Sequence, residues 1–174
     1  MSGRSIPHGV TIRPIAAGDR HELERFYAAL SADSLEARFH GATRGIGDRE
    51  ARSFCGPDHL QREGLVAVEQ RRRGPDRVVG HVCLEPIDDS SDLEIAIAVA
   101  DGWQHHGIGR ALLGAALDWA SRNGVKRLRA TIRWSNPAII GLLRSIDRPM
   151  HIANGADGDL EAVISIGQPL PAAA

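Results

Sequence analysis

Residues 93–119 read LEIAIAVADGWQHHGIGRALLGAALDW, which predicts a strand, a turn, a glycine-containing loop and a helix in direct succession. The apolar run Ile95–Ala100 has the length of a buried strand. A turn follows at Asp101-Gly102, where glycine adopts a positive φ at little cost. Beyond the loop, apolar residues recur at helical spacing and predict a helix with one apolar face: Ile108, Ala111, Leu112, Ala115 and Trp119.

The start of this helix is suited to an anion. The first backbone N–H groups of a helix have no partner within it, and the helix dipole adds partial positive charge at the same place. Arg110 lies in the first turn, where the dipole disfavours a cation, and its presence is explained if phosphate binds nearby. The segment therefore predicts a pyrophosphate-binding cradle. The alternative is a helix start whose glycines merely allow close packing.

Specific residues exclude two common phosphate-binding loops. A nucleoside-triphosphate loop requires a lysine directly after its second glycine, and no lysine follows here. A dinucleotide-binding loop requires a third glycine or alanine, where this chain has Leu112. That loop also requires an acid roughly 20 residues further on, where the chain has Lys126 and Arg127.

The pattern that remains is Q-x-x-G-x-G, made by Gln104, Gly107 and Gly109 between a strand and a helix. It resembles the acyl-CoA loop of the GCN5-related N-acetyltransferase (GNAT) family. The order of expected elements resembles that family over residues 10–166. The resemblance implies an α/β (α+β) fold, with helices on both faces of a mixed, mostly antiparallel sheet of six to seven strands.

Local patterns predict the remaining elements. Strands are expected at 10–15, 65–68, 78–84, 127–134, 150–153 and 160–166. Helices are expected to start after the capping residues Asp19 and Ser34, at 48–54, and at Pro137 with Asn136 as its cap. Asn123-Gly124 is expected to end the central helix. We expect flexible tails at 1–9 and 167–174, and a single N-acetyltransferase domain at 10–166.

A hairpin with a charged tip is predicted between the second and third strands, where Arg71, Arg72 and Arg73 precede Gly74-Pro75. Short charge runs are usually solvated turns, and we interpret this one so rather than as a docking patch for an acidic partner.

A closer resemblance, to the acetyltransferase domain of bacterial protein-lysine acetyltransferases, rests on residues outside the cradle. They are Ser31, Ser34, Arg38-Phe39 and Gly41, followed by Arg62 and residues 65–68. The resemblance implies acetyl-CoA as cosubstrate and a protein lysine as acceptor. A small amine as acceptor, or a catalytically silent acyl-CoA-binding module, stays open as an alternative.

The resemblance also implies the site residues. In the family, the fourth and fifth strands separate at a bulge, and the unpaired backbone binds the pantetheine arm. By position, the residues expected to bind the coenzyme are Ile97, Ala98, Val99, Gln104, His105, His106, Gly107, Ile108, Gly109, Arg110 and Asn136. No metal site is expected.

Glu94 is the expected general base, because it is an acid at the start of an otherwise apolar strand, near the expected thioester. A partly buried carboxylate has a raised pKa and is a better base near neutral pH. Asp92 is the second choice. Other candidates rank lower: His81, His105, His106 and Cys83, for which no activating neighbour is evident.

The chain departs from the family pattern at two places. Many members have a tyrosine seven residues after the asparagine, to protonate the leaving thiolate, and this chain has Leu143 there. A thiol with a pKa of about 8.5 leaves tolerably well unaided. The family's usual Gly-Phe after this helix is replaced by Asp147-Arg148, which concerns the substrate cleft.

Composition limits the remaining possibilities. The 174 residues, with 43% apolar and 25% charged side chains, suit one globular domain. The net charge of −1 offers no basic field for nucleic acid or membrane, so neither is expected as a partner. Two cysteines without metal-site spacing predict free thiols. With no apolar signal segment in 1–9, we expect a cytoplasmic protein, a monomer or homodimer.

Overall fold

The computed structural model describes residues 6–41, 43–88, 90–155 and 158–167. Residues 1–5 and 168–174 of the two expected tails lie outside this part of the chain. Within it, seven strands form one sheet of order β1-β2-β3-β4-β5-β7-β6. All neighbours are antiparallel except the parallel pair β4 and β5. The strands are β1 Val10–Pro14, β2 Glu63–Glu69, β3 Arg77–Pro86, β4 Leu93–Val99, β5 Arg127–Ile132, β6 Met150–Asn154 and β7 Leu160–Ser165.

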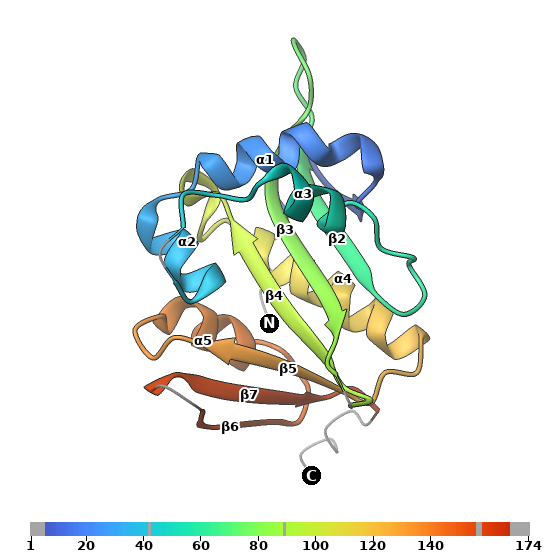
Figure 1. The fold of residues 1–174 in the computed structure, drawn as a ribbon, viewed down its shortest axis with the longest axis vertical. Coiled ribbons are helices and arrows are strands. Elements are labelled where there is room, and N and C mark those ends of the chain that lie inside the picture. Colours follow the sequence, from blue (N-terminus) through green and yellow to red (C-terminus); the bar gives the residue numbers. More distant parts are fainter. Residues whose placement is uncertain (1–5, 42, 89, 156–157, 168–174) are drawn as a thin grey trace.

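Helices cover both faces of the sheet, as expected. They are α1 Arg20–Ala28, α2 Ala32–Phe39, α3 Asp48–Phe54, α4 Ile108–Arg122 and α5 Pro137–Arg144. Figure 1 shows α1 and α3 in front of β2 and β3, with α4 behind the sheet. Two hydrophobic clusters follow this division: one holds the buried residues of α1 and α2, and the other those of α4 and α5. The predicted α/β (α+β) architecture, with helices on both faces of a mostly antiparallel sheet, is confirmed.

Local signals placed several boundaries correctly. In β5, Leu128, Ala130 and Ile132 are buried, which confirms the alternating apolar face. Gly124 has a φ of 71° directly after α4, as its role at the helix end predicts. Trp134, expected on the same strand, lies beyond β5 and is 69% exposed.

The start of α2 and the turn after β4 differ from expectation. Ser31, not Ser34, caps α2, because its hydroxyl oxygen accepts a hydrogen bond from the Ser34 N–H at 3.2 Å. The expected turn at Asp101-Gly102 is a 3₁₀ helix, Asp101–Trp103. Positive φ occurs instead at His105 (63°) and Gly107 (87°), which lie closer to the start of α4.

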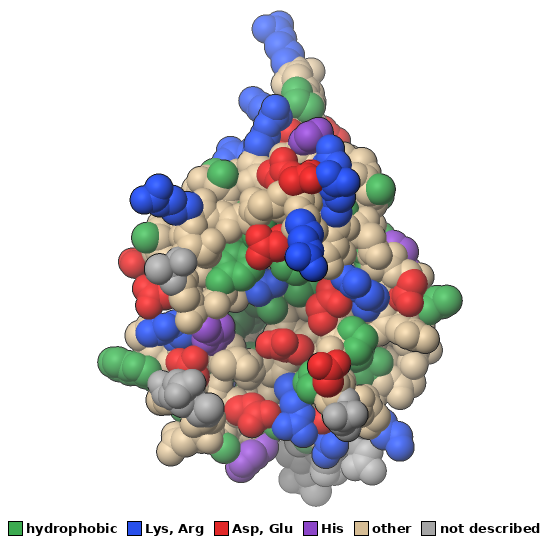
Figure 2. All heavy atoms as spheres, viewed as in Figure 1, with side chains coloured by type: hydrophobic (Ala, Val, Ile, Leu, Met, Phe, Trp, Pro, Cys, Tyr) green, Lys and Arg blue, Asp and Glu red, His purple; other side chains and the backbone are tan. Residues whose placement is uncertain are grey.

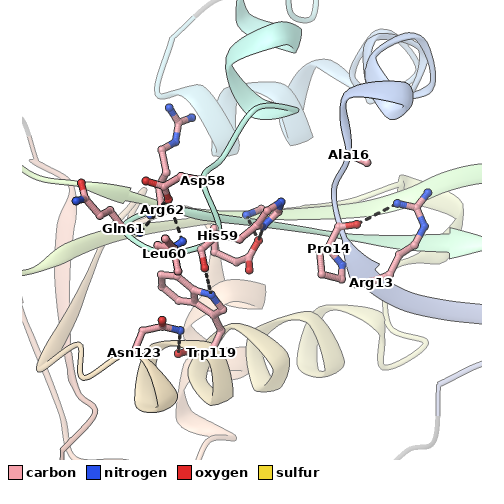
Figure 3. Close-up of polar contacts among 12 residues, drawn as sticks. Arg13, Pro14, Ala16, Asp58, His59, Leu60, Gln61, Arg62, Trp119 and Asn123 are labelled. Atoms are coloured by element: carbon pink, nitrogen blue, oxygen red, sulfur yellow. Dashed lines mark hydrogen bonds and ion pairs between the residues drawn. The ribbon is translucent and has the colours of Figure 1, made fainter.

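The loop between α3 and β2 ties the two faces of the molecule together. Asp58 accepts hydrogen bonds from three following backbone N–H groups of this loop. The indole Nε1 of Trp119, on α4, donates to the His59 carbonyl at 3.3 Å (Figure 3). The imidazole of His59 lies 2.6 Å from buried Glu63 at the start of β2. This loop therefore fixes the start of β2 against α4.

The predicted hairpin between β2 and β3 projects from the body, and Figure 2 shows basic side chains at its tip. Arg71, Arg72 and Arg73 are all exposed, as a solvated turn requires. No helix in the described part of the chain is long and apolar enough to cross a membrane.

Candidate active site

The site begins where β4 and β5 separate. These strands pair only at Leu93 with Leu128 and at Glu94 with Arg129. β4 stays paired with β3 as far as Val99, and no shift interrupts this register. The expected separation of the two strands is present, whereas the β4 register against β3 shows no bulge. Among the strands that the structure describes, none therefore pairs with this edge of β4 from Ile95 to Val99.

A cavity of about 870 Å³ occupies the space between the separated strands. Its walls come from α2, β4, the loop before α4, β5 and α5, and a recess is visible beside α2 in Figure 2. Most of the expected site residues line this one cavity: Glu94, Ile97, Ala98, Val99, Gln104, His105, Gly107, Gly109, Arg110 and Asn136.

Two expected binding residues are not among the described residues that line the cavity. The side chain of Ile108 is 1% exposed and packs into the core beneath α4. His106 is exposed, and its Nδ1 lies 2.7 Å from the Gln104 carbonyl oxygen. Any role of these two residues at a phosphate rests on their backbone rather than on their side chains.

The predicted cradle has the geometry of an open helix start. Gly107 caps α4 in the left-handed region, with a φ of 87° that favours glycine. The Ala111 N–H bonds back to the Gly107 carbonyl at 3.1 Å. By helix geometry, the N–H groups of the three preceding residues, 108–110, have no partner within the helix. They face the end where the dipole favours an anion.

The space around Gly109 bears on whether this glycine allows a ligand to approach or allows close packing within the protein. A Cβ built there would lie 3.5 Å from Leu142 and 3.7 Å from Val99, which is ordinary van der Waals contact. At Gly80, in contrast, a Cβ would lie 2.8 Å from Leu112. A side chain at position 80 would therefore force Leu112 to shift, whereas a Cβ at position 109 would displace no neighbour. The space beside Gly109 fits the close approach of a phosphate group.

A hydrogen-bond network holds the loop against α2. Asp101 accepts hydrogen bonds from the Ser31 N–H at 2.9 Å and from the hydroxyls of Ser31 and Ser34, both at 2.7 Å. Burial alone would raise the pKa of Asp101, but these hydrogen bonds outweigh it and hold the pKa below its usual value. The Gln104 amide donates to Ser34 Oγ and to the Val99 carbonyl, each at 3.2 Å. Gln104 therefore positions the loop.

Glu94 lines the cavity on the side of the sheet that α1–α3 cover. In the register of β3 and β4 it lies opposite Glu85, and Ala96 lies opposite Cys83. Because alternate residues of a strand share a face, Glu94 and Ala96 lie on the same face. The side chain of Glu94 is exposed, so the expectation of a partly buried carboxylate is wrong. The strand that ends its pairing at this residue opens it to the cavity and to solvent.

Asp92, the second-choice base, has a structural position. It is fully buried and accepts hydrogen bonds from Arg127 Nε at 2.9 Å and from Arg129 Nε at 2.7 Å. Burial raises its pKa, and the two arginines outweigh that effect, so the net pKa is lowered. It is not among the described residues that line the cavity.

His81 and Cys83, two of the lower-ranked candidates, are unsuited to acid–base or nucleophilic catalysis. Nδ1 of buried His81 lies 2.8 Å from the hydroxyl of Tyr27. Burial, together with Arg38, lowers the pKa of His81 to about 3, so its ring is neutral. Burial raises the pKa of the Cys83 thiol, which excludes an activated nucleophile at neutral pH. Both cysteines are free thiols, as predicted.

Asn136 and Leu143 occupy the far wall. Asn136 caps α5, accepting a hydrogen bond from the Ile139 N–H at 3.3 Å, with Pro137 in the first helical position. This confirms the predicted cap. Leu143 is 2% exposed and lines the cavity where the family often has tyrosine.

Sequence reasoning did not assign a role to several residues that line the cavity. Arg38 and His40 come from α2 and its C-cap, and Arg133 follows β5. Nδ1 of His40 lies 2.8 Å from Asp159, 119 residues away along the chain. Arg133 forms an ion pair with Glu36 at 3.3 Å. Only the Arg38-Phe39 match could have drawn attention to this wall.

In the described residues, no group of three or more acidic, histidine or cysteine side chains could hold a metal ion.

Comparisons with known proteins agree with this architecture. The model of the acetyltransferase (GNAT) family matches residues 20–146. No curated protein matches the sequence. Among solved structures, the GNAT domain of S. lividans PAT is similar, with a TM-score of 0.78 and 21% identity over 90% of each chain.

Two further structures were solved with acetyl-CoA. The yncA protein of Salmonella typhimurium has a TM-score of 0.71 and 20% identity, over 96% of this chain and 99% of that chain. A phosphinothricin acetyltransferase of Sinorhizobium meliloti has a TM-score of 0.67 and 21% identity, over 93% and 89% of the two chains. At these identities the likeness establishes the fold alone.

Proposed function

The chain belongs to the GNAT acetyltransferase family and is an acyltransferase enzyme, and from this premise we propose that it transfers the acetyl group of acetyl-CoA directly to an amine. The observation that carries the proposal is the coincidence of two features in one cavity. One is the unpaired edge of β4, and the other is the open helix start at Gly107–Arg110. The first suits an extended amide-containing arm, and the second suits a pyrophosphate.

The coenzyme would lie along this wall. Backbone groups of Ile97, Ala98 and Val99 would bind the pantetheine arm, and the N–H groups at the start of α4 would bind the pyrophosphate. Arg110, exposed in the first turn, would add a positive charge beside the phosphates. The Asp101 network would keep the loop in place before the coenzyme arrives, which reduces the entropy lost on binding.

Glu94 is the proposed general base. Its exposed carboxylate at the open end of the separated strands would accept a proton from the acceptor's ammonium group. The free amine then attacks the thioester carbon, and the carbon–sulfur bond breaks. The nitrogen loses its second proton to water as the amide forms, and the leaving thiolate, of pKa about 8.5, takes a proton from water, since Leu143 cannot supply one.

The proposed acceptor is a lysine side chain of a protein, as the resemblance to protein-lysine acetyltransferases suggests. A small amine is the second candidate, and a specific observation favours it. Two contacts, His40 with Asp159 and Glu36 with Arg133, join α2 to the C-terminal half of the chain beside the cavity. Contacts of this kind restrict access for a large partner.

Isothermal titration of the purified protein with acetyl-CoA tests the binding step. The wild type should bind, and a Gly109→Glu variant, which places a bulky anion in the cradle, should not. Absence of binding to the wild type would contradict the proposal. Incubation with labelled acetyl-CoA and a cell lysate, followed by separation of products by size, then distinguishes protein acceptors from small amines.

A further inference from the structure

Arg38 is a cation that forms no ion pair with any described residue of the chain. It lies in the last turn of α2 and lines the cavity. Its Nε is buried without a hydrogen-bond partner, and its Nη2 donates to the Cys83 Sγ at 3.2 Å. Among the described residues, no carboxylate oxygen lies within 4.0 Å of a guanidinium nitrogen of Arg38, the distance that defines an ion pair. A largely buried charge costs free energy unless it is paired.

The groups packed around this guanidinium do not neutralise it. Burial raises the pKa of Tyr27 to about 12 and also raises the pKa of Cys83, so both are uncharged at neutral pH. His81 is neutral as well. Glu94 acts on Arg38 electrostatically, but it lies beyond ion-pair distance and is exposed. The positive charge is therefore available to a ligand in the cavity.

Two aromatic rings hold the guanidinium in place. Its central carbon lies 4.8 Å from the centre of the Phe39 ring and 5.6 Å from that of Phe54. These cation–π contacts, with Cys83 on one side, fix the plane of the group. With Nε buried and one N–H of Nη2 on Cys83, the remaining N–H groups of Nη1 and Nη2 are the donors left for a carboxylate.

The position of Arg38 along β4 assigns it to the acceptor rather than to the coenzyme phosphates. Its partner Cys83 lies opposite Ala96, two residues from Glu94 and on the same face. At about 3.3 Å per residue, Ala96 is roughly 7 Å from Glu94 along the strand. The phosphate cradle, in contrast, begins beyond Val99, at the opposite end of β4.

We propose that Arg38 binds a carboxylate that the acceptor carries close to the amine deprotonated by Glu94. This inference rests on the proposed acetyl transfer and names the acceptor class: a molecule with a carboxylate a few ångströms from its reacting amine. A free amino acid supplies that pair, and so does a peptide in which an acidic residue neighbours the target lysine.

Matched acceptors test the inference in the wild-type enzyme. One arm compares free amino acids with their carboxamides, and the other compares blocked peptides that carry Lys-Glu or Lys-Gln. Release of the coenzyme thiol gives kcat/KM for each. We expect the carboxylate-bearing member to be preferred by about tenfold or more in the arm that contains the true acceptor type. Equal values within every pair would overturn the inference.

Variants then assign the preference to Arg38. In Arg38→Met the ratio within a pair should fall to about one, while Arg38→Lys should keep part of it. Arg25→Met, which removes an exposed arginine of α1 outside the cavity, should leave the ratio unchanged. An equal loss for both members of a pair in Arg38→Met would mean a structural role only, and would refute carboxylate binding.

A measurement without turnover covers the case in which no probe is acetylated. Acetate should raise the thermal midpoint of the wild type more than chloride does at equal ionic strength, because a ligand of the native state stabilises it. The difference should vanish in Arg38→Met. An identical response to both anions in the wild type contradicts the inference. Titration with acetyl-CoA, run in parallel, shows separately whether the proposed function itself has failed.

Discussion

Glu94 and Arg129 form the last residue pair between β4 and β5, and beyond them the two parallel strands separate. The proposed base therefore lies where the sheet opens, at one end of a cavity whose other end is the start of α4. One change in strand pairing both exposes the carboxylate and leaves the β4 backbone open to a ligand.

Replacing Glu94 with glutamine should lower kcat by about 10²-fold or more, because proton removal by a positioned carboxylate contributes on that order. The dissociation constant for acetyl-CoA, measured by titration calorimetry, should not change. Glu85→Gln is the matched control, since Glu85 lies opposite on β3, pairs with Arg62 and is not among the cavity-lining residues. Undiminished turnover in Glu94→Gln would remove this residue from the mechanism.

A methyl group at position 109 should weaken acetyl-CoA binding by about tenfold, or ~1.4 kcal/mol, without loss of stability. The reason is that a Cβ there meets only ordinary contacts within the protein and fills space beside the cradle. Gly114→Ala, in the same helix with nothing within 4 Å of the new Cβ, is the control. Both variants should gain about 0.5–1 kcal/mol in unfolding free energy from helix propensity. Equal coenzyme affinity in the two variants would show that Gly109 has no special part in binding.

Because His81 takes up a proton more readily in the unfolded chain, the free energy of unfolding should decrease as the pH falls from about 6.5 to about 3. Its pKa is lowered by burial to about 3 in the folded state, against 6.5 in the unfolded chain. Between these values the unfolded state binds more protons, so acid favours unfolding. Urea unfolding at pH 7, 5 and 4 should show a flatter pH dependence in His81→Gln, while exposed His151→Gln should behave as the wild type. An unchanged slope would mean that His81 titrates normally.

Asp92 should contribute stability at neutral pH that disappears in acid. Its folded-state pKa lies below the unfolded value of 3.8, so the contribution is present above that pH and is lost as the pH falls through the folded pKa. Asp92→Asn should lower the thermal midpoint at pH 7 by several degrees, because it weakens the hydrogen bonds from Arg127 and Arg129. Calorimetry at pH 7 and pH 3 should show the gap to the wild type narrowing. A gap that stays constant would assign the loss to packing.

Much of the fold follows from short-range patterns. The strand, loop and helix of residues 93–119, the alternation in β5 and the cap at Asn136 all appear in the structure as predicted. The cap on α2 was misplaced, because Ser31 and Ser34 are both good capping residues. Both hydroxyls donate to Asp101, some 70 residues away, and only the Ser31 oxygen also accepts the Ser34 N–H that makes it the cap.

The candidate site divides in the same way. Glycines before a helix predict the phosphate cradle from sequence, since helix starts attract anions wherever they occur. The burial of a carboxylate does not follow from its neighbours in the chain. Glu94 was expected to be partly buried and is exposed, whereas Asp92, two residues earlier, is fully buried between two arginines of β5.

The sequence by itself determined the order of elements and the helix start behind β4, because hydrophobic periodicity, glycines and capping residues act over only a few neighbouring residues. Only the tertiary structure decided which charges meet. It places Arg38 against Cys83, with no carboxylate from the described part of the chain at ion-pair distance, and it brings His40 to Asp159. Burial and charge pairing depend on segments far apart in the chain, and no local pattern records their distances.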